Sequence, residues 1–284
     1  MPLTLVQGSS LGAWGSATNG ASPANAVAVT WAQARTAGNL LVLVYASDGL
    51  MPVPAGWTSA VVALDFADME IVYRIADNTA TDAPSLDNNA ATCIAWAEYS
   101  GNTATPLDVT ASGTNNTVTG VQTRSTGTTG ATAQADELAV AAWYISSPNP
   151  GSWSGQTNSF TEVVDTATST GQDITLAVAV RALSATGTVE STATSSSLPA
   201  PGSGNGLGGA VATFKADAGG GATGHPAGRR LGLAGGCRPV EIGREGTRIM
   251  RRPEPEYRYD GGVLVPRAER PVLVVGGFER PLGV

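Results

Sequence analysis

The apolar positions of this chain fall in short runs, each about the length of one β-strand, and not in the longer periodic pattern of a helix. Clusters of Gly, Pro, Asn and Ser separate the runs, which are rich in β-branched and aromatic residues. The strongest strand candidates are residues 3–6, 26–31, 40–46, 60–64, 69–75 and 92–99. Residues 103–135 consist largely of Thr, Gly, Ser and Asn, and predict edge strands or loops. This pattern predicts an all-β domain.

The pattern of residues 38–74 occurs a second time about one hundred residues later. Residues 136–145 match the block that begins at Gly38, and residues 173–181 match the strand at 69–74, down to a closing arginine. Proline-rich turns lead to Trp153 in one copy and to Trp57 in the other. Duplication and chance likeness both remain open here. Either one predicts a jelly-roll-like antiparallel β-sandwich over residues 1–217, in two similar halves of about 1–102 and 103–217.

The composition changes after the predicted sandwich. Residues 218–228 form a Gly-rich linker, and residues 229–284 place short apolar pieces between Pro, Gly and Arg. Pieces this short cannot bury a core of their own. We therefore expect an extended Arg-rich arm that becomes ordered against the sheet edge of a partner, the alternative being a tail without fixed structure.

The charge is divided in the same way. Residues 1–218 carry sixteen acidic and five basic side chains, whereas residues 219–284 carry eleven arginines and seven acids. A basic segment attached to an acidic body predicts that the segment contacts another surface. Arginine without lysine favours bidentate contacts with carboxylates, and the interspersed acids argue against a nucleic-acid partner.

Compartment signals in the sequence are few. No apolar run approaches the roughly 18 residues that a membrane helix needs, so we expect no membrane insertion. The N-terminus lacks the pattern of a secretory signal, which predicts synthesis in a cytosol. Cys93 and Cys237 lie far apart in segments of different character, and we expect two unpaired thiols.

Residues with catalytic chemistry form no recognisable constellation. The single histidine, His225, lies in the Gly-rich linker, where nothing would orient it as a base. Asp65, Asp68 and Glu70 could bind calcium, although a solvated hairpin turn explains them more simply. Two carboxylates spaced across a cleft, as in a glycosidase, stay open from the sequence. We expect no enzyme activity, no cofactor and no metal.

Several tryptophans suggest a second kind of site. Rings on loops at one end of a sandwich can stack on sugars, and the candidates for glycan contact are Trp14, Trp57, Trp143 and Trp153. The alternative for each of these rings is packing in the core.

Four short motifs carry a resemblance to a known family. They are Thr36-Ala37-Gly38-Asn39-Leu40-Leu41-Val42, Pro54-Ala55-Gly56-Trp57-Thr58, Val72-Tyr73-Arg74-Ile75-Ala76 and Glu98-Tyr99-Ser100-Gly101. Over about residues 1–216 the chain resembles the β-sandwich domains of tailed-bacteriophage structural proteins, which include minor capsid, decoration and tail-appendage proteins. Residues 229–233 together with residues 238–248 are similar to C-terminal arms of such proteins.

The resemblance implies a virion protein made in the host bacterial cytoplasm, usually oligomeric, a trimer being common, with no catalytic residues. We expect an accessory head-decoration or minor capsid component that binds other virion proteins, either major capsid or tail proteins. The alternative is a tail-appendage module that recognises host surface glycans. The residues that we expect to anchor the arm are Arg230, Arg238, Arg244, Arg248, Tyr257, Tyr259 and Val274.

Overall fold

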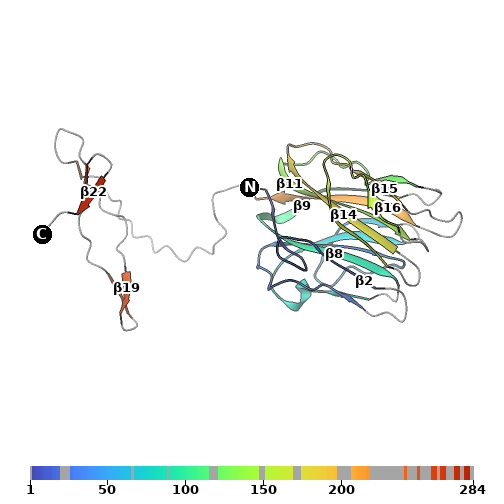
Figure 1. Cartoon of the computed structure of the whole chain (residues 1–284), viewed down its shortest axis with the longest axis horizontal. Helices are drawn as coiled ribbons and strands as arrows, with labels where there is room; N and C mark the ends of the chain where they lie inside the picture. The colour runs from blue at the N-terminus through green and yellow to red at the C-terminus, as the bar shows by residue number, and fades with distance from the viewer. Residues whose placement is uncertain are drawn as a thin grey trace. The chain divides into compact units, whose positions relative to one another are not determined.

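A computed structural model describes residues 2–19, 26–64, 67–87, 90–114, 121–146, 151–168, 174–196 and 206–217, together with six short strands between residues 240 and 281. The chain divides into two compact units, Met1–Gly221 and Ala222–Val284. The first unit confirms the predicted all-β sandwich. Its two large sheets are the blue-to-cyan and green-to-orange layers in Figure 1.

The first sheet is built from the first half of the chain. Its central strands, in spatial order, are β8 (Thr92–Ser100), β4 (Leu40–Ser47), β6 (Asp68–Ile75) and β5 (Thr58–Leu64). On the far side of β8, β1 (Thr4–Gln7) and β2 (Gly15–Asn19) pair with successive parts of that strand. All of these pairs are antiparallel, and β5 is the free edge strand.

The second sheet comes from the second half. Its order is β13 (Thr161–Ala167), β14 (Ile174–Ser184), β11 (Asp136–Ser146), β16 (Leu207–Ala216) and β9 (Asn102–Thr114). Strand β9 falls in the segment for which the sequence predicted edge strands, and it lies at the edge. The sheet is again antiparallel throughout.

The two halves share one strand order. Numbered along the chain, the central strands are β4, β5, β6 and β8 in the first half and β11, β13, β14 and β16 in the second, and their spatial order in both sheets is 4-1-3-2. In both halves the pairing of the second strand with the third has one register shift, between Ser59 and Val61 in β5 and between Glu162 and Val164 in β13. When β6 and β14 are aligned at this register shift, Arg181 occupies the position of Arg74, as the sequence predicted. The same register places Phe160, and not Trp153, at the position of Trp57, because each directly precedes the edge strand. The expected match of the two tryptophans is therefore wrong.

The central strands of both sheets are buried on both faces, which explains why β4 and β11 are almost entirely apolar. The inner faces meet in one core that includes Val42, Val44, Tyr144 and Phe214. The outer faces are covered by the connections that cross each sheet. The first cover contains β3 (Val27–Ala28), β7 (Ser85–Leu86) and the 3-10 turn η1 (Ala80–Asp82), and the second contains β10 (Thr123–Ser125), β12 (Trp153–Ser154) and β15 (Thr192–Ser195).

The second unit is described only as strands, in three antiparallel hairpins. They are β17 (Val240–Glu241) with β18 (Arg248–Ile249), β19 (Tyr257–Asp260) with β20 (Val263–Pro266), and β21 (Val272–Val275) with β22 (Phe278–Pro281). Each described strand has two to four residues, and two-stranded hairpins of this size are marginally stable in water.

Candidate functional site

A buried carboxylate, that of Glu98, links two of the motifs that carried the family resemblance, the one at residues 36–42 and the one at residues 98–101. Glu98 is fully buried on β8, and its Oε1 accepts hydrogen bonds from the Thr36 amide at 2.8 Å and from Asn39 Nδ2 at 2.7 Å. Gln7 Nε2 donates to the other oxygen at 2.5 Å, and Gln7 Oε1 accepts from the Gln33 amide. Glu98 therefore fixes the segment that leads into β4, and both of its oxygens are occupied by protein donors.

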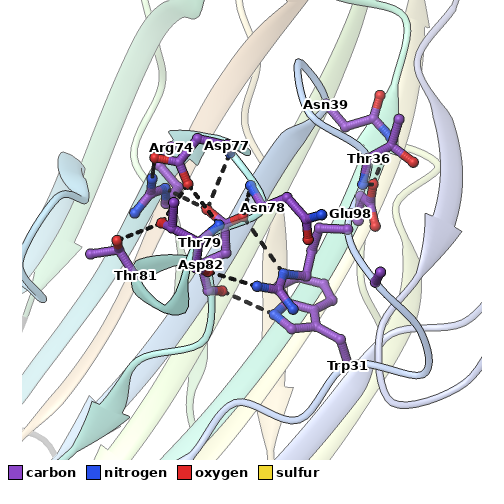
Figure 2. A network of polar contacts seen from close by, with 12 residues as sticks. Trp31, Thr36, Asn39, Arg74, Asp77, Asn78, Thr79, Thr81, Asp82 and Glu98 are labelled. Carbon is purple, nitrogen blue, oxygen red and sulfur yellow. Dashed lines mark hydrogen bonds and ion pairs between the residues drawn. The ribbon is translucent and has the colours of Figure 1, made fainter.

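A second buried carboxylate, Asp82 in η1, pairs with Arg74 of the Val72–Ala76 motif (Figure 2). Its Oδ1 lies 2.9 Å from Arg74 Nε, and its Oδ2 lies 3.6 Å from Arg35 Nε and accepts the Asn78 amide at 2.7 Å. Arg74 is only 8% exposed and also pairs with Asp77 at 2.9 Å. This arrangement holds the β6–β8 connection against the outer face of the first sheet.

The Pro-Ala-Gly-Trp motif packs against this ion pair. The Trp57 amide donates to Pro54 O at 3.0 Å, and Gly56 takes a φ of +79°, which a glycine adopts without strain. A Cβ on Gly56 would lie 3.1 Å from Arg74 Nη1 and 3.1 Å from the Thr81 side chain. The motif therefore needs glycine both for its turn and for the space beside the guanidinium.

The motif residues thus form one polar clasp, defined here as Gln7, Asn39, Arg74, Asp82, Glu98 and their partners. The sequence flagged Asn39, Arg74 and Glu98 through the motifs, but it missed Gln7 and Asp82. Since protein donors surround both carboxylates, the clasp has the character of a structural device and not of a general base.

A different polar cluster lies on the outer face of the first sheet beside its free edge. Asp68 and Glu70 on β6 are 4% and 5% exposed, and Tyr45 on β4 donates its hydroxyl to Glu70. Asp68 Oδ2 accepts the Met51 amide at 3.2 Å, while its Oδ1 is buried without a hydrogen-bond partner in the described part of the chain. Burial raises the pKa of Asp68, opposed by the Met51 amide and reinforced by the charge of Glu70. We call Tyr45, Asp68 and Glu70 the acidic cluster.

The edge strand next to the acidic cluster presents apolar side chains to solvent. Val62 pairs directly with Glu70, and Leu64 with Asp68, so each pair shares the outer face. Val62 is 43% exposed and Leu64 is 52% exposed. Leu50 and Val53, on the loop that carries Met51, are exposed as well. The exposed side chains are therefore apolar and the buried ones are acidic, which is the reverse of what solvation favours.

A third polar site lies at the start of β11. Glu137 is almost fully buried, and neither of its oxygens has a hydrogen-bond partner among the described residues, although Thr213 and Asp108 lie beside it. Burial is the main cause that raises the pKa of Glu137 to about 7; the Thr213 hydroxyl opposes this rise and the neighbouring Asp108 carboxyl contributes to it. Asp108 also lies 3.8 Å from Lys215 Nζ. Such a carboxyl can hold a proton near neutrality, but without a partner group it defines no reaction.

The four tryptophans proposed for glycan contact lie in the interior. None is more than 7% exposed, and each indole N–H donates to a protein acceptor. The acceptors of Trp14, Trp57, Trp143 and Trp153 are Tyr99 Oη, Thr81 O, Arg124 O and Thr175 Oγ1, respectively. A ring buried in this way presents no face on which a sugar could stack. The glycan assignment of these residues is therefore corrected to core packing.

The other predicted residues are placed only in part. Among the arm residues, Arg248, Tyr257, Tyr259 and Val274 lie in the hairpin strands, and their side chains are not described. The residues Asp65, His225, Arg230, Cys237, Arg238 and Arg244 lie outside the described residues. Cys93 is buried and free, and burial raises the pKa of its thiol to about 12.

Comparison of the chain with protein-family models, with curated proteins and with solved structures finds no match. Within the described residues, no helix is long and apolar enough to cross a membrane, and no three His, Cys, Asp or Glu side chains are grouped to hold a metal ion.

Proposed function

We propose that this protein is an accessory structural component of a tailed-bacteriophage particle, with the sandwich displayed and the C-terminal unit attached to neighbouring virion proteins. One observation carries the proposal, namely the division of the chain into a compact acidic sandwich and a separate basic unit of short hairpins. Short strands without a large sheet gain stability by adding to another protein. A basic unit on an acidic protein is suited to holding copies together.

The polar chemistry of the sandwich supports a structural role. The motifs that resemble phage structural proteins contribute to the clasp. Its carboxylates form an ion pair with Arg74 and accept hydrogen bonds from Asn39 and from backbone amides. A clasp that holds surface connections down resists unfolding and proteolysis, because both act first on loosely held loops. A displayed virion domain needs this property.

Immunogold microscopy of particles from the producing strain tests the proposal, with antibody raised against residues 1–217. Label over the heads is the result expected of a decoration or minor capsid protein. Label at the tail end would place the protein as a tail appendage and direct the search to host surface polysaccharide. Particles without label, from cells in which the protein is abundant, would overturn the virion proposal.

A further inference from the structure

The chain contains a single lysine, Lys215, and every other basic side chain apart from its one histidine is an arginine. Lys215 lies at the end of β16, the last strand of the sandwich. Its Nζ lies 3.8 Å from Oδ1 of Asp108 on the neighbouring strand β9. Unlike arginine, lysine can give up its proton and act as a nucleophile. The place of this lone lysine therefore permits a reaction with the carboxyl as well as an ion pair.

An irregularity in β9 sets the direction of the Asp108 side chain. In the pairing with β16, Asp108 and Val109 together lie opposite Thr213, which is the arrangement of a β-bulge. A bulge re-aims the side chains that it carries. The Asp108 carboxyl is 10% exposed, and its Oδ2 accepts the Ala133 amide at 2.6 Å. The two oxygens therefore differ, since Oδ2 is held by a backbone amide and Oδ1 lies near the amine of Lys215.

Glu137 is the third group at this place. It pairs directly with Lys215 across β11 and β16, so the two side chains share one face of the sheet, and its carboxyl lies beside Asp108. Both of its oxygens are buried without a hydrogen-bond partner among the described residues. A carboxyl that can hold a proton near neutral pH defines a reaction only with partner groups. Lys215 and Asp108 supply an amine and a second carboxyl.

The first half of the sandwich carries different chemistry at the same positions. In the shared register Asn39 occupies the position of Glu137, and Ser100 occupies that of Lys215. Asn39 donates to the buried Glu98, so the polar groups there satisfy each other. The fold itself therefore does not require a buried acid beside a lysine at this place.

We propose that Lys215 and Asp108 condense spontaneously to an amide cross-link within the chain, with Glu137 as the proton carrier. The proposal goes beyond the structural role proposed above and does not depend on it. The Lys215 ammonium first passes a proton to the Asp108 carboxylate, which leaves a neutral amine beside a neutral acid. The amine nitrogen then attacks Cγ of Asp108, and the electron pair of the carbonyl bond moves to Oδ2, where the Ala133 amide stabilises the developing charge.

The collapse of this intermediate completes the bond. Glu137 takes one proton from Nζ and delivers one to Oδ1, so that the Glu137 carboxyl is unchanged at the end. The carbonyl forms again, the Cγ–Oδ1 bond breaks, and Oδ1 leaves as a water molecule. The product is an amide between Cγ and Nζ, and the reaction consumes no oxidant, reductant or cofactor.

Confinement in the fold favours this condensation. Between separate molecules in water the free acid and amine are favoured, but groups held in position react as if present at about 10⁵–10⁸ M. Reacting atoms must approach to roughly 3–3.5 Å. The flexible stem of Lys215, whose side chain is 25% exposed, allows Nζ to move from its present position toward Cγ.

Mass spectrometry of the denatured full-length chain tests the inference directly. We expect a mass that is lower than that of the sequence by one water molecule. Trypsin should then release a branched peptide that joins residues 75–124 to residues 182–229, because a modified Lys215 is no longer cleaved. A chain with the full mass of the sequence would overturn the inference, and so would loss of water without the branched peptide.

Substitutions assign the role of each group. Lys215→Arg and Asp108→Ala should both restore the full mass of the sequence. Glu137→Gln keeps the shape of the proton carrier but not its function, and should slow formation of the bond about a hundredfold or more. Glu162→Gln, on the exposed edge strand, is the matched control and should leave the bond intact. Formation of the bond in Glu137→Gln at the rate of the control would overturn the role of Glu137.

Thermal unfolding provides a readout that does not depend on mass. A covalent bond that closes a loop of about one hundred residues should raise the midpoint by about 10–20 °C. Lys215→Arg keeps the charge but cannot form the bond, so it should unfold that much lower than the wild-type chain. Equal midpoints would contradict a cross-link, while the proposed place of the protein in a particle would stand.

Discussion

The ion pair between Asp82 and Arg74 should be among the largest single contributions to the stability of the sandwich. Asp82→Asn keeps the shape of the side chain but removes its charge, which leaves the Arg74 guanidinium, 8% exposed, without its buried partner. Removing one member of a buried pair typically costs about 3–5 kcal/mol. Because Asp77 remains 2.9 Å from Arg74, we expect the lower limit, about 3 kcal/mol.

Thermal unfolding followed by far-UV circular dichroism measures this loss. For a domain of this size, about 3 kcal/mol corresponds to a fall in the midpoint of about 6–12 °C. Asp77→Asn is the matched control, since it makes the same change to the other partner of Arg74 at a site that is 54% exposed, and it should leave the midpoint nearly unchanged. If Asp82→Asn lowered the midpoint by less than about 2 °C, the clasp would not be holding the β6–β8 connection as described.

Three further predictions concern other buried groups. In the folded protein the pKa of Glu137 is raised to about 7, above its unfolded value, so stability should fall as pH rises from about 4.5 to 7. Urea unfolding at both pH values, with Lys215→Arg in every chain to prevent the cross-link, should therefore show that Glu137→Gln stabilises the protein by about 1–2 kcal/mol at pH 8 and has no effect at pH 4. The control Glu162→Gln, on the exposed edge strand, should have no effect at either pH. Equal stability of the chains with and without Glu137→Gln at pH 8 would contradict the prediction. Gly56→Ala should lower the thermal midpoint more than Gly12→Ala. Both glycines have a positive φ, but of the two only Gly56 has neighbours within 4 Å of an added Cβ. Equal midpoints would show that crowding by Arg74 and Thr81 does not affect stability. Cys93 should resist iodoacetamide in the native state at pH 8 and react fully in urea, as mass spectrometry can show, and native-state alkylation would contradict its burial.

Much of the sandwich could be predicted from the sequence because its strands are apolar on both faces. The block at residues 40–46 became β4, and the block at 136–145 became β11, since such runs suit only a position between two packed layers. The strand predicted at residues 26–31 is reduced to Val27–Ala28, because these residues lie in the cover of the first sheet and pair only with β7. Local pattern indicates an extended chain but not which layer it joins.

The polar groups were harder to predict. Asp82 lies in Asp-Asn-Thr-Ala-Thr-Asp, which has the composition of an exposed turn, and only the crossing connection carries it beneath Arg74. Asp68 and Glu70 resembled hairpin-end acids for the same reason, and their burial depends on the loop that brings Met51 over them. Trp57 and Trp153 were misassigned because turn positions suggested exposure, whereas the crossing connections pack against the sheets. Trp143 lies within β11, and Trp14 packs in the core between the sheets.

We propose that the C-terminal unit anchors the sandwich to the particle. The most direct test compares the full chain with a chain lacking residues 219–284 by the amount of each that sediments with purified particles. The shortened chain should keep its β-sheet circular dichroism spectrum but be lost from the particles. Incorporation of the shortened chain at the level of the full chain would contradict the account.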